Sequence, residues 1–125
     1  MNNTETPENI VDFDEMLGEE LDFYGVDGTC FKLDDVIYEA VERNDRLDEV
    51  RECDRDKYHR FHASPIARVV IEECEDNRAY GYQLTDLHDG HCWLRFGTED
   101  YFTGGRSYDT TFLFDYTPKA PIGND

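Results

Sequence analysis

The chain has 125 residues, in which 30 Asp and Glu outnumber 12 Lys and Arg, and its formal net charge is −18 with a mean hydropathy of −0.77. It holds no run of about 18 apolar residues and begins without a basic and apolar leader, so we expect neither a membrane-spanning helix nor a secretory signal. So acidic a surface repels phosphates, which argues against direct binding to nucleic acid or to an anionic membrane.

The aromatic content indicates a folded chain. Low hydropathy and high charge are typical of disorder, but disordered chains are poor in aromatic residues, and this one has eight Phe, eight Tyr and one Trp. A length of 125 residues suits one domain. We therefore expect a polar N-terminal tail over residues 1–11 and a single β-rich domain with a ring-rich core over residues 12–125.

A short helix is predicted over residues 12–21. Phe13 and Met16 have helical spacing, and Asp12 is a suitable N-cap. Glu15, three residues after Asp12, completes an Asp version of the capping box.

The next segment favours a hairpin. Residues 29–33 alternate in polarity, residues 36–42 begin with β-branched side chains, and Asp34–Asp35 between them is a turn sequence. Residues 42–60 are densely charged, and we interpret them as a short helix or a mobile loop.

The clearest pattern is a series of strands in the second half. Alternating segments are separated by turn residues, with Asp89–Gly90 as the strongest hairpin signal in the chain and a Gly-rich loop over residues 98–109. The predicted strands are 66–74, 79–87, 92–97 and 110–116. The fold class is therefore mostly β, an antiparallel meander sheet of at least five strands or a small barrel-like domain, with one or two short helices.

The four cysteines are widely spaced and form no CxxC motif; they are Cys30, Cys53, Cys74 and Cys92. Without a secretory signal, reduced and buried thiols in a cytoplasmic protein are the simplest interpretation, ahead of a disulfide or metal ligation.

All four histidines fall in two HxxH pairs, His59/His62 and His88/His91, and Cys92 follows the second pair. A two-residue turn at Asp89–Gly90 would place His88 opposite His91, close enough to share a zinc ion. HxxH without paired cysteines is a weak pattern, and a solvated turn together with a polar segment before a strand is the better explanation of the histidines. We therefore expect no metal and no cofactor, and keep a His/Cys metal protein as an alternative.

The acidic residues are concentrated toward the start of the chain. Residues 1–56 carry 19 acids and 5 bases, net −14, whereas residues 57–125 carry 11 acids and 7 bases, net −4. The first 31 residues hold nine acids and no Lys or Arg. A small basic island, with Lys57, Arg60 and Arg68 and no acid, occupies residues 57–68. Blocks of one charge often belong to interaction segments.

This distribution indicates a protein-binding role without catalysis, since no catalytic motif is present. Carboxylates on a rigid surface imitate the spacing of phosphates, so we expect a nucleic-acid mimic that inhibits a basic DNA- or RNA-binding protein, of the defence-system or nuclease inhibitor type. The alternatives are an accessory domain that binds a basic partner without mimicry, and solvation of a halophilic surface, which an excess of Arg over Lys and of Asp over Glu would suit. The predicted partner-binding residues are Asp12, Asp14, Glu15, Glu19, Glu20, Asp22, Asp34 and Asp35.

Overall fold

The computed structural model describes residues 9–53, 60–74, 78–104 and 107–119, and within them the chain forms one nine-stranded antiparallel sheet. The order across the sheet is β1-β5-β4-β3-β2-β6-β7-β8-β9, and the sheet does not close into a barrel. The mostly-β, antiparallel prediction is confirmed. The elements are β1 Ile10–Val11, the 3₁₀ helix η1 Phe13–Met16, β2 Glu20–Asp27, β3 Cys30–Leu33, β4 Val36–Glu42, β5 Leu47–Glu52, β6 Ala67–Glu73, β7 Ala79–Asp86, β8 Cys92–Gly104 and β9 Ser107–Tyr116.

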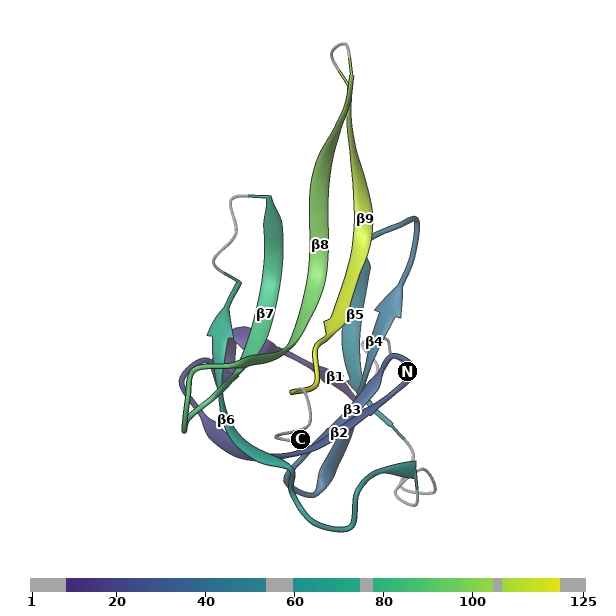
Figure 1. Ribbon diagram of the computed structural model, residues 1–125. Helices are drawn as coiled ribbons and strands as arrows, with labels where there is room; N and C mark the ends of the chain where they lie inside the picture. The colour runs from purple at the N-terminus through teal and green to yellow at the C-terminus, as the bar shows by residue number, and fades with distance from the viewer. Residues whose placement is uncertain (1–8, 54–59, 75–77, 105–106, 120–125) are drawn as a thin grey trace, which may run out of the picture.

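Two meanders make up the sheet. Strands β2 to β5 and strands β6 to β9 each follow one another as neighbours, and the pairing of β2 with β6, from Glu20↔Val70 to Phe23↔Ala67, joins the two groups. Figure 1 shows the groups curling toward each other around a common interior, with the β8–β9 hairpin rising above the rest. The predicted β3–β4 hairpin is confirmed, with Leu33 opposite Val36 on either side of Asp34–Asp35.

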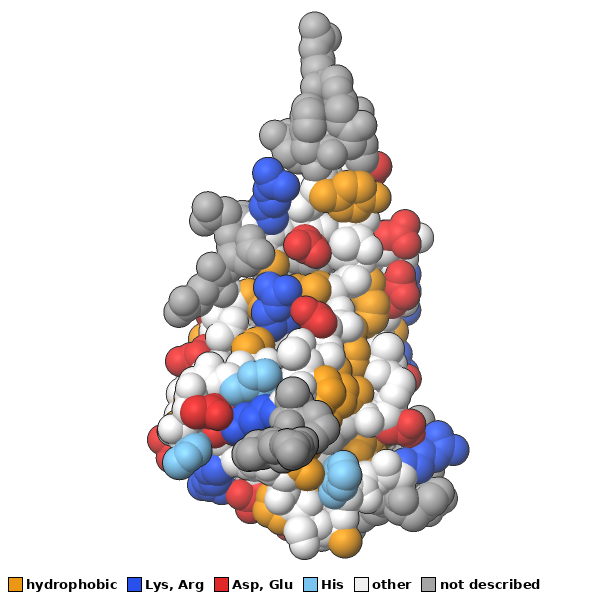
Figure 2. Space-filling view, viewed as in Figure 1, with side chains coloured by type: hydrophobic (Ala, Val, Ile, Leu, Met, Phe, Trp, Pro, Cys, Tyr) orange, Lys and Arg blue, Asp and Glu red, His pale blue; other side chains and the backbone are white. Residues whose placement is uncertain are grey.

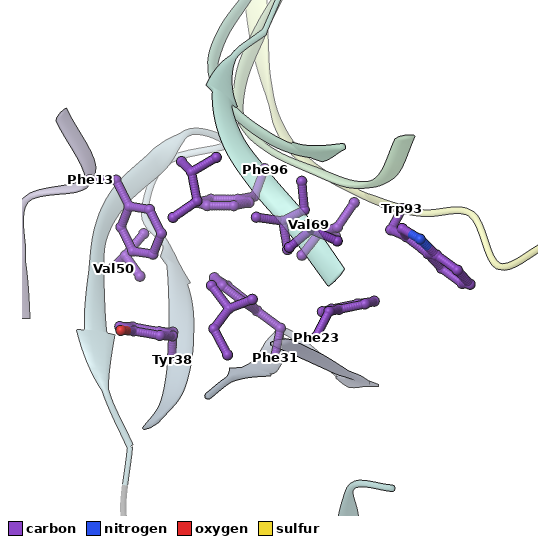
Figure 3. Packing of buried hydrophobic residues seen from close by; sticks show 12 residues of the cluster. Phe13, Phe23, Phe31, Tyr38, Val50, Val69, Trp93 and Phe96 are labelled. Carbon is purple, nitrogen blue, oxygen red and sulfur yellow. The ribbon is translucent and has the colours of Figure 1, made fainter. Parts of the chain in front are cut away.

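The core lies on the concave face of this curled sheet. Phe31 of β3 packs against Phe96 of β8 and Phe114 of β9, with ring centroids 4.9 and 6.3 Å apart, although these strands are far apart in the sheet order. The Leu47 amide of β5 donates to Oγ1 of Thr98 of β8 at 2.9 Å. The curvature therefore brings the two halves of the sheet together over one aromatic core (Figure 3).

Residues 12–21 do not form the predicted helix. Asp12 does cap η1, accepting from the Asp14 amide at 3.0 Å, but the helix is a single 3₁₀ turn. Gly18, at φ +87°, turns the chain, and its amide donates to the Ile71 carbonyl at 2.8 Å. This contact with β6 draws the following residues into the sheet as β2, so pairing with a neighbouring strand overrides local helix propensity.

The predictions for the densely charged residues 42–60 and for the Gly-rich residues 98–109 are wrong in part, because both segments contribute to strands. Residues 47–52, within the predicted helix or loop, form β5, in which Val50 is buried against Ala40 of β4. The loop predicted over residues 98–109 is largely strand, because β8 continues to Gly104 and β9 begins at Ser107. In both places cross-strand pairing organises a sequence with weak alternation of its own.

The hairpin turn at Asp89–Gly90 is confirmed, but it is longer than two residues. The Asp86 amide donates to the His91 carbonyl at 2.7 Å, and the Gly90 amide donates to the Asp86 carbonyl at 2.9 Å. Four residues, 87–90, thus separate Asp86 from His91. His88 lies inside this turn and is therefore not opposite His91. The predicted two-residue turn would have placed the two histidines opposite each other.

Candidate functional site

Five of the predicted acids lie on one short stretch, residues 12–20, which we call the acidic segment. Its carboxylates belong to Asp12, Asp14, Glu15, Glu19 and Glu20, all of them exposed. Phe13 fixes this stretch to the body of the protein, because its ring is 2% exposed and lies within 5.2–5.6 Å of the rings of Tyr38, Tyr82 and Phe96. The acids are therefore held by a buried anchor.

Tyr82 gives the acidic segment a second attachment. Its hydroxyl donates to Oδ1 of Asp14 at 2.6 Å. Burial, this hydrogen bond and the nearby charges of Asp14, Asp12 and Glu73 raise the pKa of Tyr82 far above its usual range, so the hydroxyl stays a donor at any physiological pH. The bond positions Asp14 without removing its negative charge.

The other three predicted acids, Asp22, Asp34 and Asp35, lie where β2 meets the β3–β4 turn. The Asp22 amide donates to Oδ1 of Asp34, and the Asp34 amide donates to the Asp22 carbonyl, both at 2.8 Å. Arg68 of β6 reaches Oδ1 of Asp22 at 3.1 Å. Partial burial and the charges of Asp22, Asp35 and Asp34 raise the pKa of Tyr24. Arg68 thus partly neutralises this group of three acids, and the hydrogen bonds between Asp22 and Asp34 stabilise the β3–β4 turn.

The five carboxylates of the acidic segment make no ion pair with a described residue, a property they share with other described acids such as Glu42 and Glu52, and they are distinguished by lying close together on residues 12–20. The acids that pair with Lys or Arg within 4 Å lie elsewhere: Asp22, Asp27, Asp48, Glu49, Asp86, Asp89 and Asp115. No ion pair between described residues involves the five carboxylates of the acidic segment. No Lys or Arg side chain of the described residues therefore offsets these carboxylates.

The basic island does not form a separate basic surface where the structure describes it. Arg60 pairs with Asp27 at 3.4 Å and Arg68 with Asp22 at 3.1 Å. Lys57 and His59 lie outside the described residues. The two described arginines of the island thus neutralise carboxylates of β2.

A shallow groove of about 480 Å³ adjoins the acidic segment. Leu17 and Gly18 form one wall and residues 70–74 of β6 and its end form the other. It exists because the hydrogen bonds of Gly18 and Glu19 to Ile71 are the last between this part of the chain and β6, whereas β6 continues to Glu73. The sequence pattern contains no sign of this groove, since it depends on where two strands part.

The β7–β8 turn carries His88 and His91, the pair considered as zinc ligands. The carboxylates of the same turn contact the ammonium group of Lys119. Nζ of Lys119 lies 2.9 Å from Oδ2 of Asp86 and 2.8 Å from Oδ2 of Asp89. Nε2 of His91 lies 2.6 Å from the Thr117 carbonyl oxygen. Within the described ranges, no group of three or more His, Cys, Asp or Glu is arranged to hold a metal ion.

The four cysteines are free thiols. Sγ of Cys30 and Sγ of Cys53 lie 3.6 Å apart, a neighbourhood that the sequence did not predict, and the Cys53 thiol lies 3.7 Å from Oε1 of Glu39. Burial raises the pKa of the Cys92 thiol, against the opposing effects of Arg95 and of the Leu94 backbone. Such a thiol is a poor nucleophile at neutral pH.

Comparison with protein-family models, with curated proteins and with solved structures found no match to this chain. In the part of the chain that the structure describes, no helix is long and apolar enough to cross a membrane.

Proposed function

We propose that this protein acts in the cytoplasm by binding a basic, nucleic-acid-binding protein through the acidic segment, and that it inhibits this partner as a nucleic-acid mimic without catalysis of its own. The observation that carries the proposal is the set of five exposed carboxylates at residues 12–20 that make no ion pair with a described residue, in a chain of net charge −18. Lys and Arg in a nucleic-acid-binding groove would meet these carboxylates in place of phosphates.

The anchoring of the segment supports mimicry. A nucleic-acid duplex presents charges at fixed spacing, so a mimic gains from carboxylates that do not have to be ordered on binding. The buried ring of Phe13 and the Tyr82–Asp14 hydrogen bond supply this order. The groove beside Leu17 and Glu73 would accept the aliphatic stem of a Lys or Arg whose charged end reaches the carboxylates.

An accessory domain that binds a basic partner without mimicry is the second candidate. The observation that favours it is the exposure of aromatic rings on β7 and β8, with Tyr80 60% and Tyr101 44% exposed. Tyr is enriched in protein interfaces, because it offers a large contact area with a polar end. In this case the sheet would carry the contact.

Capture of partners from the host lysate, followed by kinetics with the purified partner, tests the mimic proposal. We expect capture at about 0.1 M salt and loss of it at about 1 M, where the Debye length falls from about 10 Å to 3 Å. Glu15→Gln, Glu19→Gln and Glu20→Gln together should slow association several-fold, since charges at the rim of an interface act mainly on the association rate. Added DNA or RNA should compete for the partner.

The matched control removes the same charge elsewhere. Glu42→Gln, Asp45→Asn and Glu52→Gln alter three exposed acids of the β4–β5 region and should leave the association rate nearly unchanged. A partner whose affinity is indifferent to salt, to both sets of substitutions and to added nucleic acid would contradict mimicry. The accessory-domain candidate would then lead.

A further inference from the structure

The outer edge of β9 carries backbone groups with no partner among the described residues. β9 is the last strand of the sheet. The Thr117 amide donates to the Trp93 carbonyl at 2.8 Å, and Leu94 lies opposite Tyr116. Since hydrogen bonding alternates along an antiparallel pair, odd-numbered residues of β9 bond to β8 and even-numbered residues direct their amide and carbonyl outward. The outward residues with described side chains are Thr110, Phe112, Phe114 and Tyr116.

β9 lacks most of the features that protect an edge strand. It runs for ten residues, contains no Pro and no Lys, and keeps an unbroken register with β8 from Tyr116 to Tyr108. The opposite edge of the sheet, β1, has only two residues. A long and regular edge is a ready template for a further strand, because each outward amide and carbonyl gains a partner.

The side chains beside this edge define the chemistry of the added strand. Phe112 and Phe114 stack with centroids 6.2 Å apart on the core side, and Asp109 and Asp115 are exposed on the other side, where Asp115 also pairs with Arg95 of β8 at 3.3 Å. Figure 2 shows hydrophobic side chains in a band along β9 with Asp and Glu side chains flanking it. A strand that alternates apolar residues on one face with Lys or Arg on the other complements both features.

We propose that β9 binds an extended, basic segment of a partner protein by strand addition, with apolar side chains beside Phe112 and Phe114 and basic side chains beside Asp109 and Asp115. A second copy of this chain is a poorer occupant. Each copy carries a net charge of −18, and antiparallel pairing centred on Phe112 would place Asp109 of each copy opposite Asp115 of the other. The proposal goes beyond the proposed function and does not rest on the acidic segment.

Hydrogen exchange followed by NMR tests strand addition directly. The probe is a synthetic peptide of about ten residues that alternates Val and Lys, added to the whole protein. We expect the outward amides of Thr110, Phe112, Phe114 and Tyr116 to exchange at least about tenfold more slowly with the peptide bound. A Val and Glu peptide of the same length should give no protection. Peptide binding that leaves these four amides unprotected would overturn the proposal.

Two modifications separate backbone pairing from attraction of charge. A Val and Lys peptide that is N-methylated at alternate residues keeps its charge but loses its donors on one edge, so it should lose the protection. In the protein, Thr110→Pro removes an outward amide while leaving the ladder with β8 intact, and Thr110→Val keeps that amide. We expect Thr110→Pro to weaken binding at least about fivefold relative to Thr110→Val.

Two results would count against this assignment. Equal binding of the methylated and unmethylated peptides would reduce the interaction to charge alone. Concentration-dependent protection of the same amides in the protein without peptide, together with a dimer in sedimentation, would identify a second copy as the occupant instead of a basic partner. Neither result depends on whether Glu15→Gln, Glu19→Gln and Glu20→Gln slow the association tested above, so the two proposals fail separately.

Discussion

The indole Nε1 of Trp93 donates a hydrogen bond of 2.9 Å to Oδ2 of Asp86, across the bulge where β7 and β8 shift register. Asp86 is 5% exposed, and burial alone would raise its pKa. Hydrogen bonds from Trp93, from Lys119 and from the His88 amide outweigh burial and lower its pKa to about 2. The Asp86 carboxylate thus links the β7–β8 turn, the Trp93 indole and Lys119, the last described residue, in one cluster.

Asp86→Asn should destabilise the protein by about 2–4 kcal/mol, because it leaves the Lys119 ammonium without its buried partner. A carboxyl whose pKa is lower in the folded state contributes stability above its unfolded pKa, here 3.8, and loses it as the pH falls through about 2. The difference between wild type and variant should therefore be constant from about pH 5 to 7 and shrink toward pH 2.

Chemical denaturation of both proteins across that pH range measures the difference. Asp89→Asn is a matched control, since Asp89 shares Lys119 but is exposed, and it should cost much less. A stability difference that persists unchanged at pH 2 would show that the contribution of Asp86 does not depend on its charge.

Alternation of polarity predicts strands β6 and β7 well, because each of them has one face in the core. In β6 and β7, the alternating residues Val69, Ile71 and Leu84 are all fully buried, as the pattern requires. For residues 12–21 the same pattern gives a wrong prediction, because Phe13 and Met16 also fit a 3₁₀ turn. The decisive contact is the hydrogen bond from Gly18 to the carbonyl of Ile71, which is distant in the sequence. Local patterns carry no information about such a contact.

The candidate site was predictable in its composition but not in its ion pairing. Counting charges identifies all eight acids, yet only the structure separates Asp22, which Arg68 neutralises, from Glu15, Glu19 and Glu20. Arg68 follows Asp22 by 46 residues, and β2–β6 pairing brings them together. The edge of β9 was hidden for a related reason, since sheet order decides which strand lies last.

Phe13→Ala should be among the most damaging substitutions. The ring is 2% exposed and contacts rings from both halves of the sheet, so its removal leaves a cavity at their junction. We expect a loss of about 3–5 kcal/mol in the free energy of unfolding. Leu17→Ala, four residues later and 38% exposed, should cost under about 1 kcal/mol. Similar costs for both substitutions in urea denaturation would refute the role of Phe13 as an anchor.

Gly81 and Gly97 are opposite each other in β7 and β8, and neither position has room for a side chain. A Cβ on Gly81 would meet the backbone of Phe96 and Gly97, and Gly81 also has φ +151°. Gly81→Ala should therefore destabilise the protein by well over the roughly 1–2 kcal/mol expected for Gly28→Ala, where φ is +63° but the surrounding space is open. Thermal denaturation of both variants provides the comparison, and equal shifts in Tm would mean that the two strands separate easily.

Added salt should stabilise this protein. Salt screens both the ion pairs and the repulsion between acids, and we expect the weaker repulsion to have the larger effect on stability. Screening weakens ion pairs such as Arg43–Asp48, but this arginine is 64% exposed and such surface pairs contribute about 0–1 kcal/mol each. Screening also weakens the mutual repulsion of 30 acids against only 12 bases, which acts throughout the folded chain. We expect Tm to rise by several degrees between about 0.1 M and 1 M NaCl, a direction that differential scanning calorimetry would establish.

Glu15→Gln, Glu19→Gln and Glu20→Gln together should raise Tm at low salt and reduce the gain from added salt, because they remove carboxylates that make no ion pair with a described residue. A fall in Tm with salt would mean that the ion pairs outweigh the repulsion.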